Sequence, residues 1–166
     1  MLNNCLIIIL KADDMLLRNT LIHGLRRDQL IEVLDISEFP VVHVDNPFVQ
    51  PESTGIKPVI FNIDELHVAI TPISSLNFDW EWAPVDTILI EVIIPPVAID
   101  LVDKENTFLR TSGIGHIQCE PGGASIRRTV TFVGGITADN LLYQLRLMCV
   151  SALHLLGEEL EDEQEC

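Results

Sequence analysis

This chain of 166 residues has few of the features that identify metal, disulfide or membrane proteins. Its four cysteines are scattered and form no CxxC pair, so neither a zinc site nor a disulfide framework is expected, and a reducing cytoplasm is the simplest location. The longest apolar stretch, Ile88–Ile99, is far shorter than a membrane span and is interrupted by Glu91, Pro95 and Pro96. No basic residue precedes the apolar stretch near the N-terminus, so no signal peptide is expected.

Basic residues are also scarce. Ten lysines and arginines stand against 25 aspartates and glutamates, which gives a net charge of -15. A field of that sign repels phosphate backbones and anionic lipid surfaces, so neither nucleic acid nor a membrane is an expected partner. Part of the charge is local, because six carboxylates and no base lie between Glu158 and Glu165. We therefore expect a single domain over residues 1–157 and a solvated acidic tail over 158–166.

The hydropathy pattern predicts an α+β fold, an antiparallel β-sheet with flanking helices in the order α-β-β-β-α-β-β-α. Apolar residues after Asp13 and Asp14, including Leu21 and Ile22, predict a first helix, and one apolar stripe predicts a second helix over Arg26–Leu34. Short β-branched runs separated by prolines then predict strands. The remaining predicted elements are strands near Phe39–Asp45, Val59–Ile63, Leu66–Ile70, Thr87–Ile94, Phe108–Gln118 and Ser125–Val133, a short helix over Val97–Asn106 and a long last helix that Thr137 caps.

An aromatic segment, Phe78 to Trp82, holds both tryptophans of the chain. Strict alternation predicts an amphipathic strand or extended loop with Phe78, Trp80 and Trp82 on one face. That face either fills the core or forms an exposed contact surface. These three residues are the candidate partner-binding residues.

A glycine turn before the last helix offers the second candidate site. Gly134, Gly135 and Thr137 lie where free N–H groups of a helix N-terminus can hold an anion, and Arg127 and Arg128 come shortly before them. The two glycines are equally suited to reversing the chain, and the spacing is not that of a P-loop. A small-molecule or nucleotide site made of these five residues is therefore the alternative interpretation.

Other polar residues suggest no catalytic or metal centre. Gly113-Ile114-Gly115 is half of a dinucleotide-binding pattern and falls inside a predicted strand, so we set it aside. The pairs His116 with Cys119 and Cys149 with His154 have spacings that point their side chains apart, so neither a metal nor another cofactor is expected.

The charged residues in the predicted sheet leave one question open. Glu91 interrupts the most apolar strand and needs either exposure at an edge or a partner. Arg127 and Arg128 on the last strand are able to pair with it or to solvate an edge.

Several segments resemble the YbjN family, whose members are described as bacterial sensory transduction regulators. The resemblance rests on Ile94–Leu101, which leads to Asn106, and on Gly135-Ile136-Thr137, which opens a long helix at Leu141 and Leu145. It implies a fold similar to that of type III secretion chaperones.

The resemblance also implies a non-enzymatic adaptor or regulator, a small homodimer without catalytic residues that binds a protein partner. In this interpretation an extended partner segment is held by apolar grooves and sheet edges, and the acidic surface favours basic partners. Dimerisation would cover an apolar sheet face or the last helix.

Overall fold

A computed structural model describes residues 19–36, 41–43, 58–63, 66–73, 80–94, 99–120 and 123–164. In chain order, its helices and strands are β1 (Leu21–Ile22), α2 (Arg27–Asp35), β2 (Val41–His43), β3 (Val59–Ile63), β4 (Leu66–Pro72), β5 (Thr87–Ile94), α3 (Ile99–Thr111), β6 (His116–Glu120), β7 (Gly123–Thr131), β8 (Ile136–Thr137) and α4 (Ala138–Gln164). The bounds of β3 and β5 are those that the sequence predicts.

The main sheet has six strands in the order β2-β3-β4-β5-β7-β6, and every neighbouring pair is antiparallel. Strands β1 and β8 form a separate antiparallel pair. The expected α+β class with an antiparallel sheet is confirmed. Four strands, β2 to β5, lie between α2 and α3, where the sequence predicts four separate strands although the expected order counts three.

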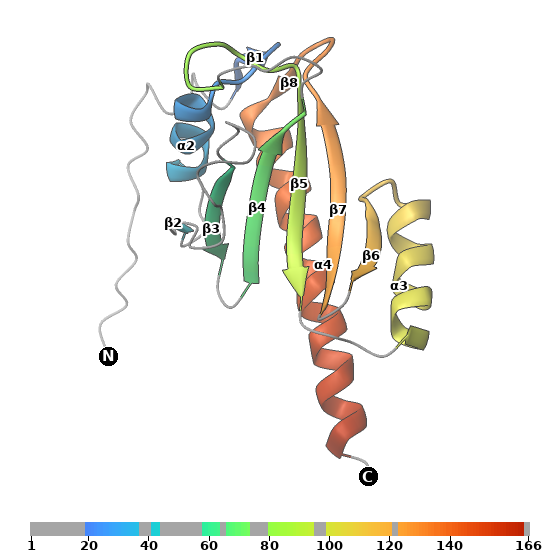
Figure 1. The fold of residues 1–166 in the computed structure, drawn as a ribbon. Helices are drawn as coiled ribbons and strands as arrows, with labels where there is room; N and C mark the ends of the chain where they lie inside the picture. The colour runs from blue at the N-terminus through green and yellow to red at the C-terminus, as the bar shows by residue number, and fades with distance from the viewer. Residues whose placement is uncertain are drawn as a thin grey trace, which may run out of the picture.

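The helices lie on one side of this sheet and at one edge (Figure 1). Helix α4 runs behind the sheet, packs against β5 and also contacts α2 and α3. Helix α3 lies beside the edge strand β6. No described helix covers the opposite face, which is the one turned toward the viewer in Figure 1.

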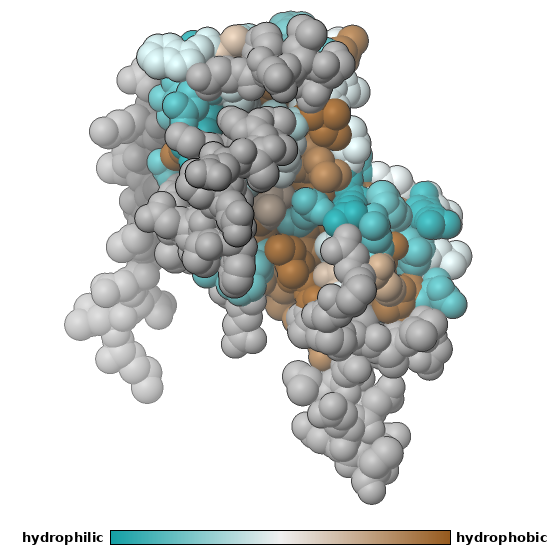
Figure 2. Space-filling model, viewed as in Figure 1, coloured by the Kyte–Doolittle hydropathy of each residue, from teal (hydrophilic) through white to brown (hydrophobic). Residues whose placement is uncertain are grey.

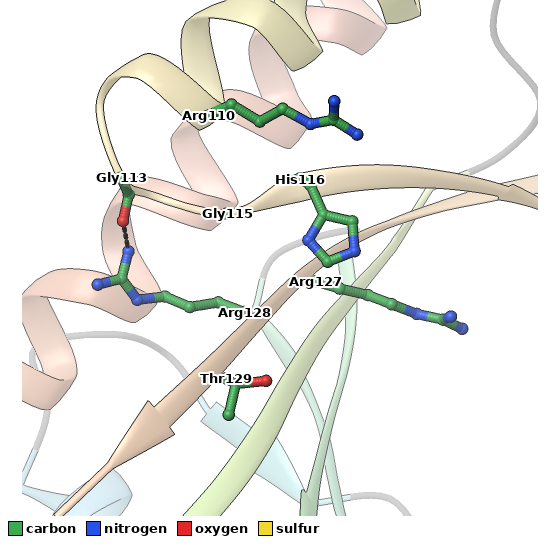
Figure 3. A pocket seen from close by; sticks show the side chains of 7 residues that line it. All are labelled: Arg110, Gly113, Gly115, His116, Arg127, Arg128 and Thr129. Carbon is green, nitrogen blue, oxygen red and sulfur yellow. Dashed lines mark hydrogen bonds between the residues drawn. The ribbon is translucent and has the colours of Figure 1, made fainter.

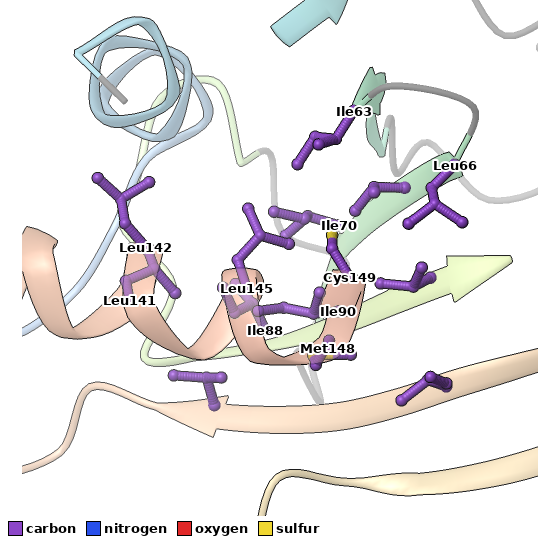
Figure 4. Packing of buried hydrophobic residues seen from close by; sticks show 14 of the residues in the cluster. Ile63, Leu66, Ile70, Ile88, Ile90, Leu141, Leu142, Leu145, Met148 and Cys149 are labelled. Atoms are coloured by element: carbon purple, nitrogen blue, oxygen red, sulfur yellow. The ribbon is translucent and has the colours of Figure 1, made fainter. Parts of the chain in front are cut away.

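The core lies between α4 and the sheet. Ile88, Ile90, Val92 and Ile94 of β5 are fully buried, as the alternation of this strand predicts. They pack with a matching apolar stripe on α4, and Figure 4 shows the two surfaces in contact. The residues of that stripe are Leu141, Leu142, Leu145, Met148, Cys149, Ala152 and Leu155.

Helix α4 begins as the sequence predicts. The backbone N–H of Asn140 donates to Oγ1 of Thr137 at 3.2 Å, which is the expected N-cap bond. The helix continues past Glu158, where the acidic tail is expected to begin, and ends at Gln164.

The prediction of a first helix that includes Leu21 and Ile22 is wrong. These residues form β1 and pair with Thr137 and Ile136 of β8. The pairing is between segments far apart in the chain, so a local hydropathy pattern does not contain it. The rest of that predicted helix, from Asp13 onward, lies outside the described residues.

The predicted boundary between the short helix and the following strand is also wrong. Residues 108–111 belong to α3, and β6 begins only at His116. The buried positions of α3 are Val102, Glu105 and Leu109, which have helical spacing. The central one is a carboxylate, so the apolar stripe that would reveal the full helix is interrupted.

Candidate functional site

The two tryptophans do not share a strand face. Residues 80–82 form a turn, in which Trp80 is 3 % exposed and Trp82 is 81 % exposed. Nε1 of Trp80 donates to the backbone oxygen of Leu25 at 2.8 Å. Trp80 is therefore a core residue, Trp82 alone remains exposed as a candidate contact residue, and Phe78 lies outside the described residues.

The glycine turn serves the chain reversal between β7 and β8. Gly134 and Gly135 have φ values of 91° and 85°, a region that favours glycine. A Cβ on Gly135 would lie 2.9 Å from Cε1 of His23, so that side chain already fills the adjacent space. The described structure does not bring this turn and Thr137 into the pocket that Arg127 and Arg128 line.

The sheet face that no described helix covers is partly apolar. Leu89 and Ile93 of β5 point to this face, and the Ile93 side chain is 48 % exposed. In Figure 2 hydrophobic residues lie on both sides of a hydrophilic patch in the region of β5 and β7. We call the part formed by Leu89, Glu91, Ile93 and Arg127 the open face.

Glu91 has its partner on the neighbouring strand. The register places it directly opposite Arg127, and Nε of Arg127 lies 2.6 Å from Oε1 of Glu91. Both side chains are 21 % exposed. Nη1 of Arg127 also donates to Oε1 of Gln118 on β6. Of the two alternatives for Glu91, a partner is therefore the one that the structure shows, and the partner is Arg127. Arg128 points to the opposite face.

The Glu91–Arg127 pair is expected to contribute modestly to stability. Because both groups are partly exposed, a double-mutant cycle of Glu91→Gln and Arg127→Gln should give a coupling free energy of about 1 kcal/mol. Urea unfolding of the four proteins measures it, and the value should fall when salt is raised. A coupling near zero at low salt would contradict the ion pair.

A second feature is an open pocket of about 640 Å³ at the sheet edge. Its lining comes from the end of α3, the following turn, the first residue of β6 and the middle of β7 (Figure 3). The lining residues are Arg110, Gly113, Gly115, His116, Arg127, Arg128 and Thr129. We call it the edge pocket.

The edge pocket exists because β6 is shorter than β7. His116 is opposite Arg127 in register and is the first residue of β6. Beyond this point β7 has no paired strand on that side among the residues that the structure describes. Successive side chains of a strand point to opposite faces. Arg127 and Arg128 therefore border the same pocket from the two faces of the sheet.

The turn between α3 and β6 is a Schellman motif, not a strand as the sequence predicts. Ile114 N–H donates to Leu109 O at 3.0 Å, and Gly113 N–H donates to Arg110 O at 3.2 Å. Gly113 has a φ of 67°, which this motif requires. Nη1 of Arg128 donates to Gly113 O, which fixes the turn against β7. Gly113-Ile114-Gly115 is thus a helix terminator that shapes the pocket.

Arg128 is held in a partly buried position. Burial lowers the pKa of its guanidinium from the ordinary value. Its Nε atom is buried and has no hydrogen-bond partner within the described part of the chain.

The histidines and cysteines do not converge on a metal. Cys119 is exposed on β6 and Cys149 is buried in α4. Nδ1 of His154 lies 3.7 Å from Oε2 of the nearly buried Glu105, which joins α4 to α3. Within the residue ranges that the structure describes, no three His, Cys, Asp or Glu side chains are grouped so that they could hold a metal ion.

From the sequence, His116 is weighed only as a pair with Cys119, and Arg110 is not singled out. Each is separated from Arg127 and Arg128 by at least ten residues of chain, and only the β6–β7 pairing and the α3–β6 turn bring them together. Arginine in the last turn of a predicted helix was the only available signal, and the predicted helix ended too early to show it.

The fold and these two surfaces define a protein of the α+β class with an open sheet face and a basic edge pocket. Comparison with family models, curated proteins and solved structures finds no match to this chain. The resemblance to the YbjN family therefore stays a prediction. Among the described helices, none combines the length and the apolar character needed to cross a membrane.

Proposed function

We propose that this chain is a non-enzymatic adaptor or chaperone-like regulator of the cytoplasm that holds a segment of a partner protein. The observation that carries the proposal is the open face, a sheet surface that no described helix covers. Exposed apolar area on a folded domain marks sites of interaction. Its pattern of Leu89 and Ile93 around the Glu91–Arg127 pair suits an extended segment with alternating apolar and polar side chains.

We further propose that two copies associate through α4. Tyr143, Val150 and Leu153 are exposed although they are apolar, and their spacing of seven and three residues places them along one side of the helix. That side faces away from the core stripe. A symmetric pair of helices would bury these side chains in an isologous contact and leave both open faces accessible.

The resemblance to the YbjN family and to type III secretion chaperones supports the same class of function. The strongly acidic composition is compatible with a soluble carrier of basic partner segments. The alternative, a nucleotide or small-molecule site at Gly134 and Gly135, has less support, because His23 occupies the space beside Gly135 and the Thr137 hydroxyl caps α4.

Light scattering tests the dimer. The intact chain should show twice its mass of 18.6 kDa, and Val150→Asp should reduce this to the mass of one chain, because a buried charge opposes association. Val133→Asp, also at an exposed apolar residue, is the control and should stay dimeric. A monomeric intact chain contradicts this part of the proposal.

Affinity capture tests the open face. The chain should retain a defined protein from an extract of its source cells, and Ile93→Asp should weaken the affinity of that purified protein about tenfold or more. Val133→Asp and the circular dichroism spectrum of each variant control for general effects. Equal affinity of Ile93→Asp and the intact chain would remove the open face as the binding surface.

A further inference from the structure

The edge pocket concentrates positive charge on an acidic protein. Three of the ten basic residues line it, together with His116, and none of its seven lining residues is acidic. Glu91 neutralises Arg127 at 2.6 Å, so Arg110 and Arg128 remain as the uncompensated charges. In a chain with a net charge of -15, such a concentration needs a physical reason.

Arg128 is the strongest indication of a ligand. Its side chain is partly buried, so desolvation disfavours its charge. No carboxylate within the described part of the chain forms an ion pair with it. One amino group donates to the Gly113 carbonyl, whereas the buried Nε has no acceptor there. A buried donor without an acceptor costs free energy unless a bound group satisfies it.

Arg110 and His116 line the same pocket, and in Figure 3 they lie on the other side of the view from the Arg128 guanidinium, which extends to Gly113. Arg110 is exposed in the last turn of α3 and has no ion-pair partner within the described residues. His116 is exposed at the start of β6 and stands between Arg110 and Arg127 in the view of the pocket.

Stabilisation of the α3 C-terminus accounts for part of this arrangement. Cations there interact favourably with the helix dipole, and Arg128 also binds a carbonyl at this end. That role requires neither His116 nor an open space of about 640 Å³.

We propose that the edge pocket binds the oxyanion group, phosphate or carboxylate, of a small molecule. Guanidinium groups bind both anions through paired N–H donors. Arg110 and Arg128 supply the charge, His116 supplies a further ring nitrogen, and Thr129 supplies a hydroxyl at the pocket rim. The edge pocket shares Arg127 with the open face, but the proposed anion site does not rest on partner binding, which is measured with purified proteins and without the ligand.

Calorimetric titration of the full chain with inorganic phosphate and with citrate tests the proposal. At least one probe should bind saturably, and Arg110→Gln should weaken its binding about tenfold or more, because a charge-assisted contact is lost. Arg110 is exposed, so this variant should fold. Arg146→Gln, which removes the same charge from an exposed position of α4 outside the pocket, should change the affinity less than twofold.

The two probes separate the sources of the anion. Tighter binding of phosphate supports a phosphorylated ligand, and tighter binding of citrate supports a carboxylate ligand. Amide chemical-shift changes should centre on Gly113, Gly115 and His116. The proposal is overturned if neither probe binds saturably, or if Arg110→Gln and Arg146→Gln weaken binding equally.

Discussion

Replacing Trp80 by alanine is expected to lower the free energy of unfolding by about 3–5 kcal/mol. The side chain is almost fully buried, so its removal leaves a cavity between the loop before β5 and the segment that enters α2. It also removes one of two hydrogen bonds to the Leu25 carbonyl, which keeps the bond from the Val85 N–H at 3.0 Å. Urea unfolding followed by circular dichroism measures the change.

Trp82→Ala is the matched control for this experiment. It removes the same side chain two residues away, but from an 81 % exposed position, so the change should stay within about 0.5 kcal/mol. The fluorescence of the two single-tryptophan proteins adds a second readout, because acrylamide should quench Trp82 readily and Trp80 poorly. Similar losses of stability in both variants would contradict the turn that separates these side chains.

Replacing Gly115 by alanine is expected to lower the free energy of unfolding by about 2–3 kcal/mol. A Cβ at this position would lie 2.6 Å from the backbone oxygen of Arg127, and no rotamer of alanine relieves that contact. The turn between α3 and β6 would have to move away from β7. The variant should therefore also alter the edge pocket, which Gly115 lines.

Gly157→Ala is the matched control: the same substitution is expected to raise, not lower, the free energy of unfolding. Gly157 lies within α4, and a Cβ there would meet no atom within 4 Å. Because glycine is a poor helix former, this variant should be more stable by about 0.5–1 kcal/mol. Thermal unfolding of both variants checks the pair, and a destabilised Gly157→Ala together with a neutral Gly115→Ala would contradict the close approach of the α3–β6 turn to β7.

Local patterns in the sequence determined the class of the fold and several of its elements. The alternation of Thr87–Ile94 placed β5 with its buried face, and the apolar stripe after Thr137 placed α4 with its cap. These signals succeed because the buried residues of a strand recur every two positions and those of a helix every three to four positions. The sequence also showed that Glu91 requires either exposure at an edge or a partner, since a carboxylate in such an apolar strand is costly to bury alone, but it did not decide between the two.

Only the tertiary structure decided which distant residues meet. Leu21 and Ile22 become a strand through pairing with β8, and Trp80 and Trp82 separate because their segment turns against Leu25. The edge pocket depends on the register of β6 against β7 and on the turn at Gly113, so Arg110 and His116 join Arg128 only in the folded chain. Pairing across long loops is set by the free energy of the whole packed core, which a short stretch of sequence does not determine.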